Sequence, residues 1–357
     1  MKPFDLNQIV RPNILALTPY SCARDEFKGE ASIFLDANES PYDTGLNRYP
    51  DPMQMQLKQR VSALKSVPEE QIFFGNGSDE AIDLVYRIFC RPGHDNVVAP
   101  SPTYGMYAVA AEINDVEYRS VALNPDFSLD VEQILAAIDE RTKVLWLCSP
   151  NNPTGNLLSR TALTEILERF TQGVVVIDEA YIDFVASTPE AVADHSWCRM
   201  LGQYKQLIVL QTFSKAWGLA GVRVGMAFAS SDIISLFNRV KYPYNLSVLA
   251  QQQALLRLDE AAEVYAEVQT IVSERQSLAR ELAAIPGVYN VYPSDANFLL
   301  VKVSDADALY TRLCDEGIIV RNRNRVTLCH GCLRISIGTP SQNRLLLVAL
   351  RRFLAEA

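Results

Sequence analysis

The sequence predicts an α/β fold, in which a large domain with a mostly parallel sheet covered by helices precedes a smaller α+β domain. From about residue 36, short apolar runs alternate with helical patterns, as is typical of parallel strands joined by helical crossovers. The runs are apolar throughout, as expected of strands buried on both faces. We therefore expect an amino-terminal arm over 1–35, a large domain over 36–250 and a small C-terminal domain over 251–357.

The first half of the chain supplies the arm and the sheet. Residues 1–35 contain prolines and no regular periodicity, so we expect an irregular arm that packs with the C-terminal domain. Helical patterns cover 79–90 and 159–170. The strand-like runs include 72–74, 96–99, 143–148, 174–177, 207–210 and 224–228.

The second half begins with a long helical stretch over 246–284 that is rich in Ala, Glu, Gln and Leu. Pro286 and Gly287 mark its end, because this pair disfavours further helix. Strand-like runs at 297–301 and 333–337 then flank a helical pattern, and a terminal helix follows. This mixture predicts the smaller α+β domain.

The composition of the 357 residues is ordinary for a globular enzyme, with 48% hydrophobic and 21% charged residues. The formal net charge of −9 argues against a nucleic-acid partner, because phosphate backbones select basic surfaces. The first residues lack the apolar core of a signal peptide, and no apolar run is long enough to cross a bilayer. We therefore expect a cytoplasmic protein with no membrane partner. The seven cysteines, an odd number, fit reduced thiols.

Metal and histidine chemistry find little support in the sequence. The stretch Cys329-His330-Gly331-Cys332 resembles a metal or redox corner, but one such pair without a second is weak evidence for zinc. None of the three histidines has an obvious nucleophile or carboxylate partner. We expect no metal site, and a lysine is the better candidate for a general base.

Polar motifs follow the predicted strands at their carboxyl ends, where sheets of this class place their active sites. After the first strand, the turn 75–80 leads into a helix whose free N–H groups can hold a phosphate. A simple capping turn, with Ser78 or Asp79 as the N-cap, is the alternative. After the second strand, Tyr104 either lies flat on a planar cofactor or packs in the core.

The third and fourth strands end in further polar groups. The turn 149–155 has the residues of a rigid turn, and the Asn152–Pro153 bond is a candidate for a cis peptide. Asp178 ends a buried strand, where an ionised carboxylate needs a partner such as a protonated pyridine nitrogen. Tyr181 can then donate to the oxygen of the same ring. A magnesium site is the alternative for the strand-terminal acid, but the glycine-rich loop that it needs is absent.

Lys215 is the most informative residue of the chain. It follows the strand-like run 207–210 within the stretch 212–223. A lysine with Ser214 directly before it and Arg223 eight residues later looks like the anchor of pyridoxal phosphate (PLP), with the serine and the arginine on the phosphate. A solvated surface lysine is the alternative.

Together these motifs resemble those of the fold type I, PLP-dependent aminotransferases of class II. The turn 152–155, Asp178 with Tyr181, and Lys215 followed by Arg223 occur in order, each after a strand. The closest resemblance is to the histidinol-phosphate aminotransferase family, and it covers nearly the whole chain. The other stretches that match the pattern of this family are 17–20, 35–41, 47–50, 102–107 and 331–336.

The resemblance implies a role for each residue of the cofactor site. Lys215 bonds the cofactor aldehyde and shuttles the proton, Asp178 pairs with the pyridine nitrogen, and Tyr104 stacks on the ring. Asn152 and Tyr181 bind the ring oxygen. The residues implied to hold the cofactor phosphate are Ser78, Asp79, Ser214, Arg223 and, from the neighbouring subunit, Tyr49.

The same resemblance implies a homodimer with shared sites and a pocket for anionic substrates. Arg321 and Arg334 bind the anionic ends of the substrates, because guanidinium groups bind both carboxylate and phosphate. Tyr20 and Asn38 line the pocket. The loop 322–330 shows no motif that can be interpreted.

The expected reaction is reversible transamination between histidinol phosphate with 2-oxoglutarate and imidazole acetol phosphate with glutamate. An aromatic amino-acid aminotransferase on the same scaffold is one alternative. A lyase similar to threonine-phosphate decarboxylase is another. A non-catalytic PLP-binding regulator is the third, and it usually needs a DNA-binding module, of which no segment before residue 36 has the pattern.

Overall fold

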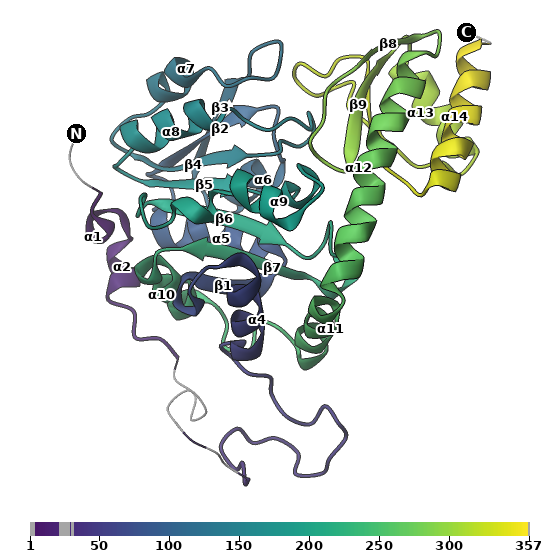
Figure 1. Cartoon of the computed structure of the whole chain (residues 1–357). Helices are drawn as coiled ribbons and strands as arrows, with labels where there is room; N and C mark the ends of the chain where they lie inside the picture. Colours follow the sequence, from purple (N-terminus) through teal and green to yellow (C-terminus); the bar gives the residue numbers. More distant parts are fainter. Residues whose placement is uncertain (1–3, 21–28, 30–31, 356–357) are drawn as a thin grey trace.

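The computed structural model describes residues 4–20, 29 and 32–355. Two separate sheets organise the chain, a seven-stranded mixed sheet and a four-stranded antiparallel sheet (Figure 1). The α/β large domain and the smaller α+β domain expected from the sequence are therefore confirmed. The boundaries expected at residues 36 and 251 stay predictions.

The large sheet has the order β1-β7-β6-β5-β4-β2-β3. Strand β7 runs antiparallel to both of its neighbours, and the other pairs are parallel. All six strands named from the sequence are present, and the edge strand β3 was missed because it has no apolar run. The bounds are β1 (Ile72–Asn76), β2 (Asn96–Ser101), β3 (Glu117–Ala122), β4 (Thr142–Cys148), β5 (Val174–Asp178), β6 (Leu207–Thr212) and β7 (Val224–Ala229).

Helices cover both faces of this sheet (Figure 1). Because successive side chains of a strand alternate between faces, Phe73 and Trp146 pack under α5, α6 and α10, while Phe74 and Leu145 pack under α4, α7 and α8. The bounds are α4 (Met55–Lys65), α5 (Ser78–Phe89), α6 (Met106–Ile113), α7 (Val131–Ala136), α8 (Arg160–Arg169), α9 (Pro189–His195) and α10 (Ser231–Val240), with 3-10 turns η1 (Glu69–Gln71), η2 (Ile182–Phe184), η3 (Trp197–Met200) and η4 (Ala220–Val222).

The helical stretch expected over 246–284 consists of two helices, α11 (Val248–Asp259) and α12 (Ala261–Ala283). Ser247 caps the first helix by accepting from the Ala250 amide. The break falls at Glu260, whose backbone leaves the helical region with φ −94° and ψ 21°. The long helix α12 leads from the large domain to the small one (Figure 1).

The small domain packs helices against its antiparallel sheet, which has the order β10-β11-β9-β8. Leu299 and Val301 of the sheet share a core with Leu278 and Leu282 of α12. The bounds are β8 (Val288–Val291), β9 (Phe298–Val303), α13 (Ala306–Asp315), β10 (Arg321–Asn322), β11 (Cys332–Ser336) and α14 (Pro340–Ala355).

The described part of the arm contains two short helices, α1 (Leu6–Ile9) and α2 (Pro12–Leu15). Ile9 and Ile14 are buried in the core beneath α5 and α10, and Arg11 Nη1 donates to the Arg87 carbonyl at 2.9 Å. The helices α1 and α2 therefore pack with the large domain and not with the small domain, because their apolar residues complete the core of the large domain. Residues 32–50 form neither helix nor strand and extend away from the body (Figure 1).

Candidate active site

One pocket lies at the carboxyl ends of β4, β5 and β6. Every residue that the sequence assigned to the cofactor, apart from Tyr49, lines this pocket, and so the structure brings nine of the ten together. Such crevices at strand ends are the usual ligand sites of open α/β sheets. The pocket is lined by Ser78, Asp79, Tyr104, Cys148, Asn152, Asp178, Ala180, Tyr181, Thr212, Ser214, Lys215 and Arg223.

One end of the pocket combines a helix amino terminus with a guanidinium group. Helix α5 begins at Ser78, so its free N–H groups and the positive end of its dipole face this region. Arg223 Nη2 donates to Asp79 Oδ2 at 3.0 Å, and Nη1 donates to Ser214 Oγ at 3.4 Å. The helix N–H groups and the guanidinium are donors of the kind that a phosphate group requires.

Two glycines permit close packing at this end of the pocket. Gly77 has φ +75°, a left-handed conformation that favours glycine, and a Cβ atom there would collide with the Arg223 guanidinium. A Cβ atom on Gly225 of β7 would collide with the Ser78 amide nitrogen. The two glycines therefore let the Arg223 side chain and the start of α5 approach the backbone closely at this point.

The other end of the pocket is built around the buried carboxylate of Asp178. Its Oδ2 accepts from the Tyr107 hydroxyl at 2.6 Å, and its Oδ1 accepts from the Ala180 amide at 3.0 Å. Burial raises the pKa of Asp178, although the tyrosine hydrogen bond opposes this shift. A protonated pyridine nitrogen fits beside such a group, because it would supply the missing positive charge.

Tyr107 received no role from the sequence, although it lies in the stretch 102–107 that resembles the family pattern. Its ring is buried and stacks on Trp146, with centroids 4.7 Å apart. Its partner Asp178 lies 71 residues further along the chain. No local pattern signals this pair, since only the packing of α6 against the sheet brings it together.

Two tyrosines and the lysine enclose the middle of the pocket. Tyr104 donates its hydroxyl to Asp79 Oδ1 at 3.2 Å, and burial raises its pKa. Lys215 Nζ lies 5.6 Å from the centre of the Tyr181 ring. The lysine is open to the pocket, yet desolvation by the surrounding protein lowers its pKa, and the positive charge of Arg334 adds to this effect. A lowered pKa leaves more of the amine in the neutral form that a general base requires.

A second pocket adjoins the first and shares Tyr104, Asn152, Tyr181 and Lys215 with it. Its distinctive residues are three arginines of the small domain, Arg321, Arg323 and Arg334. Arg334 Nη1 donates to Asn152 Oδ1, and its guanidinium lies 5.2 Å from the centre of the Phe298 ring. Arg321 pairs with Arg334 across β10 and β11. The cavity beside Lys215 therefore suits anionic ligands.

Arg323 lies in the loop 322–330, for which the sequence offers no interpretation, and its place in the pocket was missed. The residues of an extended chain alternate in direction, so Arg321 and Arg323 are expected on the same side. That spacing could have indicated that Arg323 accompanies Arg321 in the pocket. It does not distinguish Arg323 from Arg325, which continues the same alternation but lies outside the pocket.

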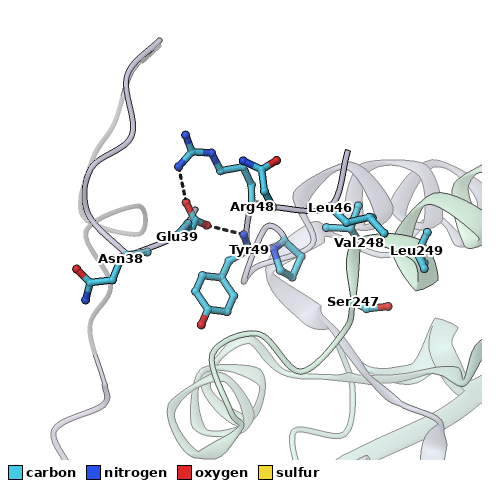
Figure 2. A pocket seen from close by; sticks show the side chains of 11 residues that line it. Asn38, Glu39, Leu46, Arg48, Tyr49, Ser247, Val248 and Leu249 are labelled. Atoms are coloured by element: carbon cyan, nitrogen blue, oxygen red, sulfur yellow. Dashed lines mark hydrogen bonds and ion pairs between the residues drawn. The ribbon is translucent and has the colours of Figure 1, made fainter. Parts of the chain in front are cut away.

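Tyr49 and Asn38 line a different pocket, formed by residues 37–39, 46–50 and 247–249 (Figure 2). The ring of Tyr49 stacks on Tyr244 with centroids 4.3 Å apart, and its amide donates to Glu39 at 2.5 Å. Tyr20 is 75% exposed. A single chain does not bring these three predicted site residues next to Lys215, and their assigned roles stay predictions.

The structure also bears on two other features of the sequence. Cys329 and Cys332 are buried, whereas His330 is exposed. In the part of the chain that the structure describes, no cluster of three or more His, Cys, Asp or Glu side chains could hold a metal ion. Within the same residues, no helix combines the length and the apolar character needed to span a membrane.

The model of one family, aminotransferase class I and II, matches residues 34–350. The chain belongs to this aminotransferase family. Two relatives are described as histidinol-phosphate aminotransferases. That of Parabacteroides distasonis is 55% identical, over 97% of this chain and 98% of its own. That of Bacteroides fragilis is 52% identical, over 98% of this chain and 99% of its own.

Solved structures share the fold of this aminotransferase. The histidinol-phosphate aminotransferase of Clostridium acetobutylicum superimposes with a TM-score of 0.79 at 23% identity, over 88% of this chain and 92% of its own. The enzyme of the same name from Sinorhizobium meliloti was solved in complex with pyridoxal 5'-phosphate. It gives a TM-score of 0.77 at 24% identity, over 87% of this chain and 83% of its own. At these identities the likeness shows the fold alone.

Proposed function

We propose that this aminotransferase binds pyridoxal phosphate and transfers an amino group between histidinol phosphate and 2-oxoglutarate, giving imidazole acetol phosphate and glutamate. The observation that carries the proposal is the pocket of three arginines beside the amine of Lys215. The donor, the acceptor and both products each carry a phosphate or a carboxylate group, and arginines bind such anions bidentately. The relatives that are about half identical over nearly the whole chain support the same reaction.

Each residue of the first pocket would serve the cofactor in a distinct way. Ser78, at the start of α5, and Arg223 would hold its phosphate, and Asp178 would pair with its ring nitrogen. Asn152 and Tyr181 bind the ring oxygen. When bound, the cofactor supplies an electron-accepting ring that stabilises negative charge at the substrate α-carbon.

Lys215 performs the proton transfer. With the cofactor in place, Nζ would remove the proton from the α-carbon of the donor and hold it beside the reacting centre. Burial and the charge of Arg334 lower the pKa of Lys215, so that more of the amine is neutral near physiological pH. Arg321 and Arg334 meanwhile hold the anionic end of the substrate and fix the α-carbon beside this base.

We further propose that the enzyme is a homodimer in which Tyr49 reaches the cofactor phosphate of the neighbouring subunit, with Tyr20 and Asn38 lining its substrate pocket. The segment 32–50 supports this assignment, because it extends from the body and exposes large apolar side chains (Figure 1). Leu35 is 88% exposed and Tyr42 is 80% exposed, which is unfavourable unless a partner covers them.

The test is a comparison of amino donors. The purified protein, loaded with pyridoxal phosphate, is supplied with 2-oxoglutarate and either histidinol phosphate, phenylalanine or threonine phosphate. We expect glutamate to form fastest from histidinol phosphate, by about 100-fold or more in kcat/KM. The reason is that the arginines bind its phosphate, whereas the phenyl ring of phenylalanine carries no charge. Faster reaction with phenylalanine would instead support an aromatic aminotransferase. Release of carbon dioxide from threonine phosphate without glutamate would support a lyase.

A further inference from the structure

The loop 322–330, for which the sequence gives no interpretation, is held in place by an acidic residue of α13. Asp307 Oδ1 accepts from Asn322 Nδ2 at 2.6 Å, and Asp307 Oδ2 accepts from Asn324 Nδ2 at 2.8 Å. Asn324 Oδ1 in turn accepts from the Gly331 amide at 2.8 Å. The two asparagines flank Arg323, so the clamp fixes the backbone of this residue from both sides.

The backbone of Arg323 is tied to the small sheet as well, through a hydrogen bond from its amide to the Cys332 carbonyl at 2.9 Å. Its side chain lines the pocket that contains Lys215, Arg321 and Arg334. The hydrogen bonds of the loop therefore hold Arg323 at the pocket. Arg325, two residues further on, does not line the pocket and is exposed.

Among the described residues, no carboxylate balances the charge of the Arg323 guanidinium. Its Nε atom is buried without a hydrogen-bond partner, and within residues 4–20, 29 and 32–355 the side chain forms no ion pair. Burial lowers its pKa, and the positive charges of Arg334 and Arg321 add to that effect. A buried, unpaired donor is costly, so this position favours the arrival of an anion.

We propose that Arg323 is a specificity-determining residue that binds the phosphate monoester of the substrate together with Arg321 and Arg334. This inference rests on the proposed function of the same site. A phosphate monoester carries up to two negative charges near neutral pH and three strong acceptor oxygens, whereas a carboxylate carries one charge and two oxygens. A third guanidinium adds charge and donors that a carboxylate does not need. Arg323 thus favours the phosphorylated substrate over the dicarboxylate that shares the pocket.

The experiment compares the two substrates of one reaction in Arg323→Gln, with Arg325→Gln as the matched control on the same loop. We expect Arg323→Gln to lower kcat/KM for histidinol phosphate by about 10- to 100-fold, mainly through KM, because a charge-assisted contact is lost. The value for 2-oxoglutarate should change by less than about threefold. Arg325→Gln should leave both values unchanged.

Inhibition by inorganic phosphate gives a second readout that does not depend on turnover of the phosphorylated substrate. Its inhibition constant against 2-oxoglutarate should rise about tenfold in Arg323→Gln and recover in part in Arg323→Lys, which restores the charge without the planar fork. Equal losses for both substrates, or unchanged phosphate inhibition, would overturn the proposal. If the unmodified enzyme does not use histidinol phosphate, the proposed function fails instead, and the phosphate inhibition of the variants still decides the role of Arg323.

Discussion

The cofactor side and the substrate side of the active site differ in how their charged groups are paired. On the cofactor side, Asp79 and Asp178 each accept hydrogen bonds from other side chains of the protein. On the substrate side, the arginines meet no carboxylate within the residues that the structure describes. Asp79 accepts from Arg223 and Tyr104, and Asp178 accepts from Tyr107. On the other side, Arg334 donates only to the neutral amide of Asn152 among the described residues.

This difference corresponds to two kinds of ligand. The cofactor-side groups lie at the ends of the large sheet and are fixed by one another, which suits a group that stays in place through many turnovers. The arginines come from the small domain and leave their positive charge unbalanced, which suits anions that arrive and leave. The predictions below test whether the two sides are as separate as this comparison implies.

The largest effect is expected for Lys215→Ala, because this lysine lies where the two pockets meet. Loss of both the covalent attachment and the base should reduce glutamate formation by about 10⁴-fold or more. The measurement is steady-state transamination at saturating pyridoxal phosphate. Lys205→Ala, which removes an exposed lysine just before β6, is the control and should keep full activity. Retention of a tenth of the activity in Lys215→Ala would contradict the assignment.

A smaller loss, about 10²- to 10³-fold, is expected for Asp178→Asn. The amide has the shape of the carboxylate but cannot balance the charge of a protonated ring nitrogen, so proton removal at the α-carbon should suffer. Cofactor retention should suffer less, because Arg223 and the start of α5 line the same pocket and would still hold the phosphate. The two quantities are measured as turnover and as pyridoxal phosphate content after dialysis. If Asp178→Asn lost the cofactor but kept its turnover number, the proposed role of Asp178 in proton removal would be contradicted.

The cofactor side was largely predictable from the sequence, and the reason is physical. Each of its motifs directly follows a continuous apolar run, and buried parallel strands place their ends at one edge of a sheet. Local patterns at Asp178 and Lys215 therefore translate into proximity without knowledge of the packing.

The features that escaped prediction depend on long-range packing. The edge strand β3 lacks a continuous apolar run, in keeping with side chains that are exposed or only half-buried. No proline or glycine marks the break between α11 and α12 at Glu260. The bond between Tyr107 and Asp178 and the place of Arg323 both require the tertiary structure. On the substrate side, the bonds of Asp307 to Asn322 and Asn324 hold Arg323 at the pocket. The residues that form these bonds belong to no familiar sequence motif.

The last prediction uses Glu179 as a control for its neighbour, because it is equally buried but does not line the pocket. Its carboxylate accepts from the Trp197 amide at 2.6 Å and from Ser196 and Gln211 at 2.7 and 2.8 Å. Burial raises the pKa of Glu179 to about 7. Glu179→Gln should therefore change turnover by less than about threefold, unlike Asp178→Asn.

Stability, in contrast, should respond to pH through this residue. The folded protein keeps the Glu179 proton up to about pH 7, whereas the unfolded chain releases it near 4.5. The stabilisation is complete below pH 4.5 and is lost as the pH rises through 7, which amounts to about 3 kcal/mol. Urea unfolding of the cofactor-free protein at pH 5 and pH 8 measures this change. Glu179→Gln should lose less stability than the unmodified protein over that interval, and parallel pH curves would show that the buried carboxylate is ionised throughout.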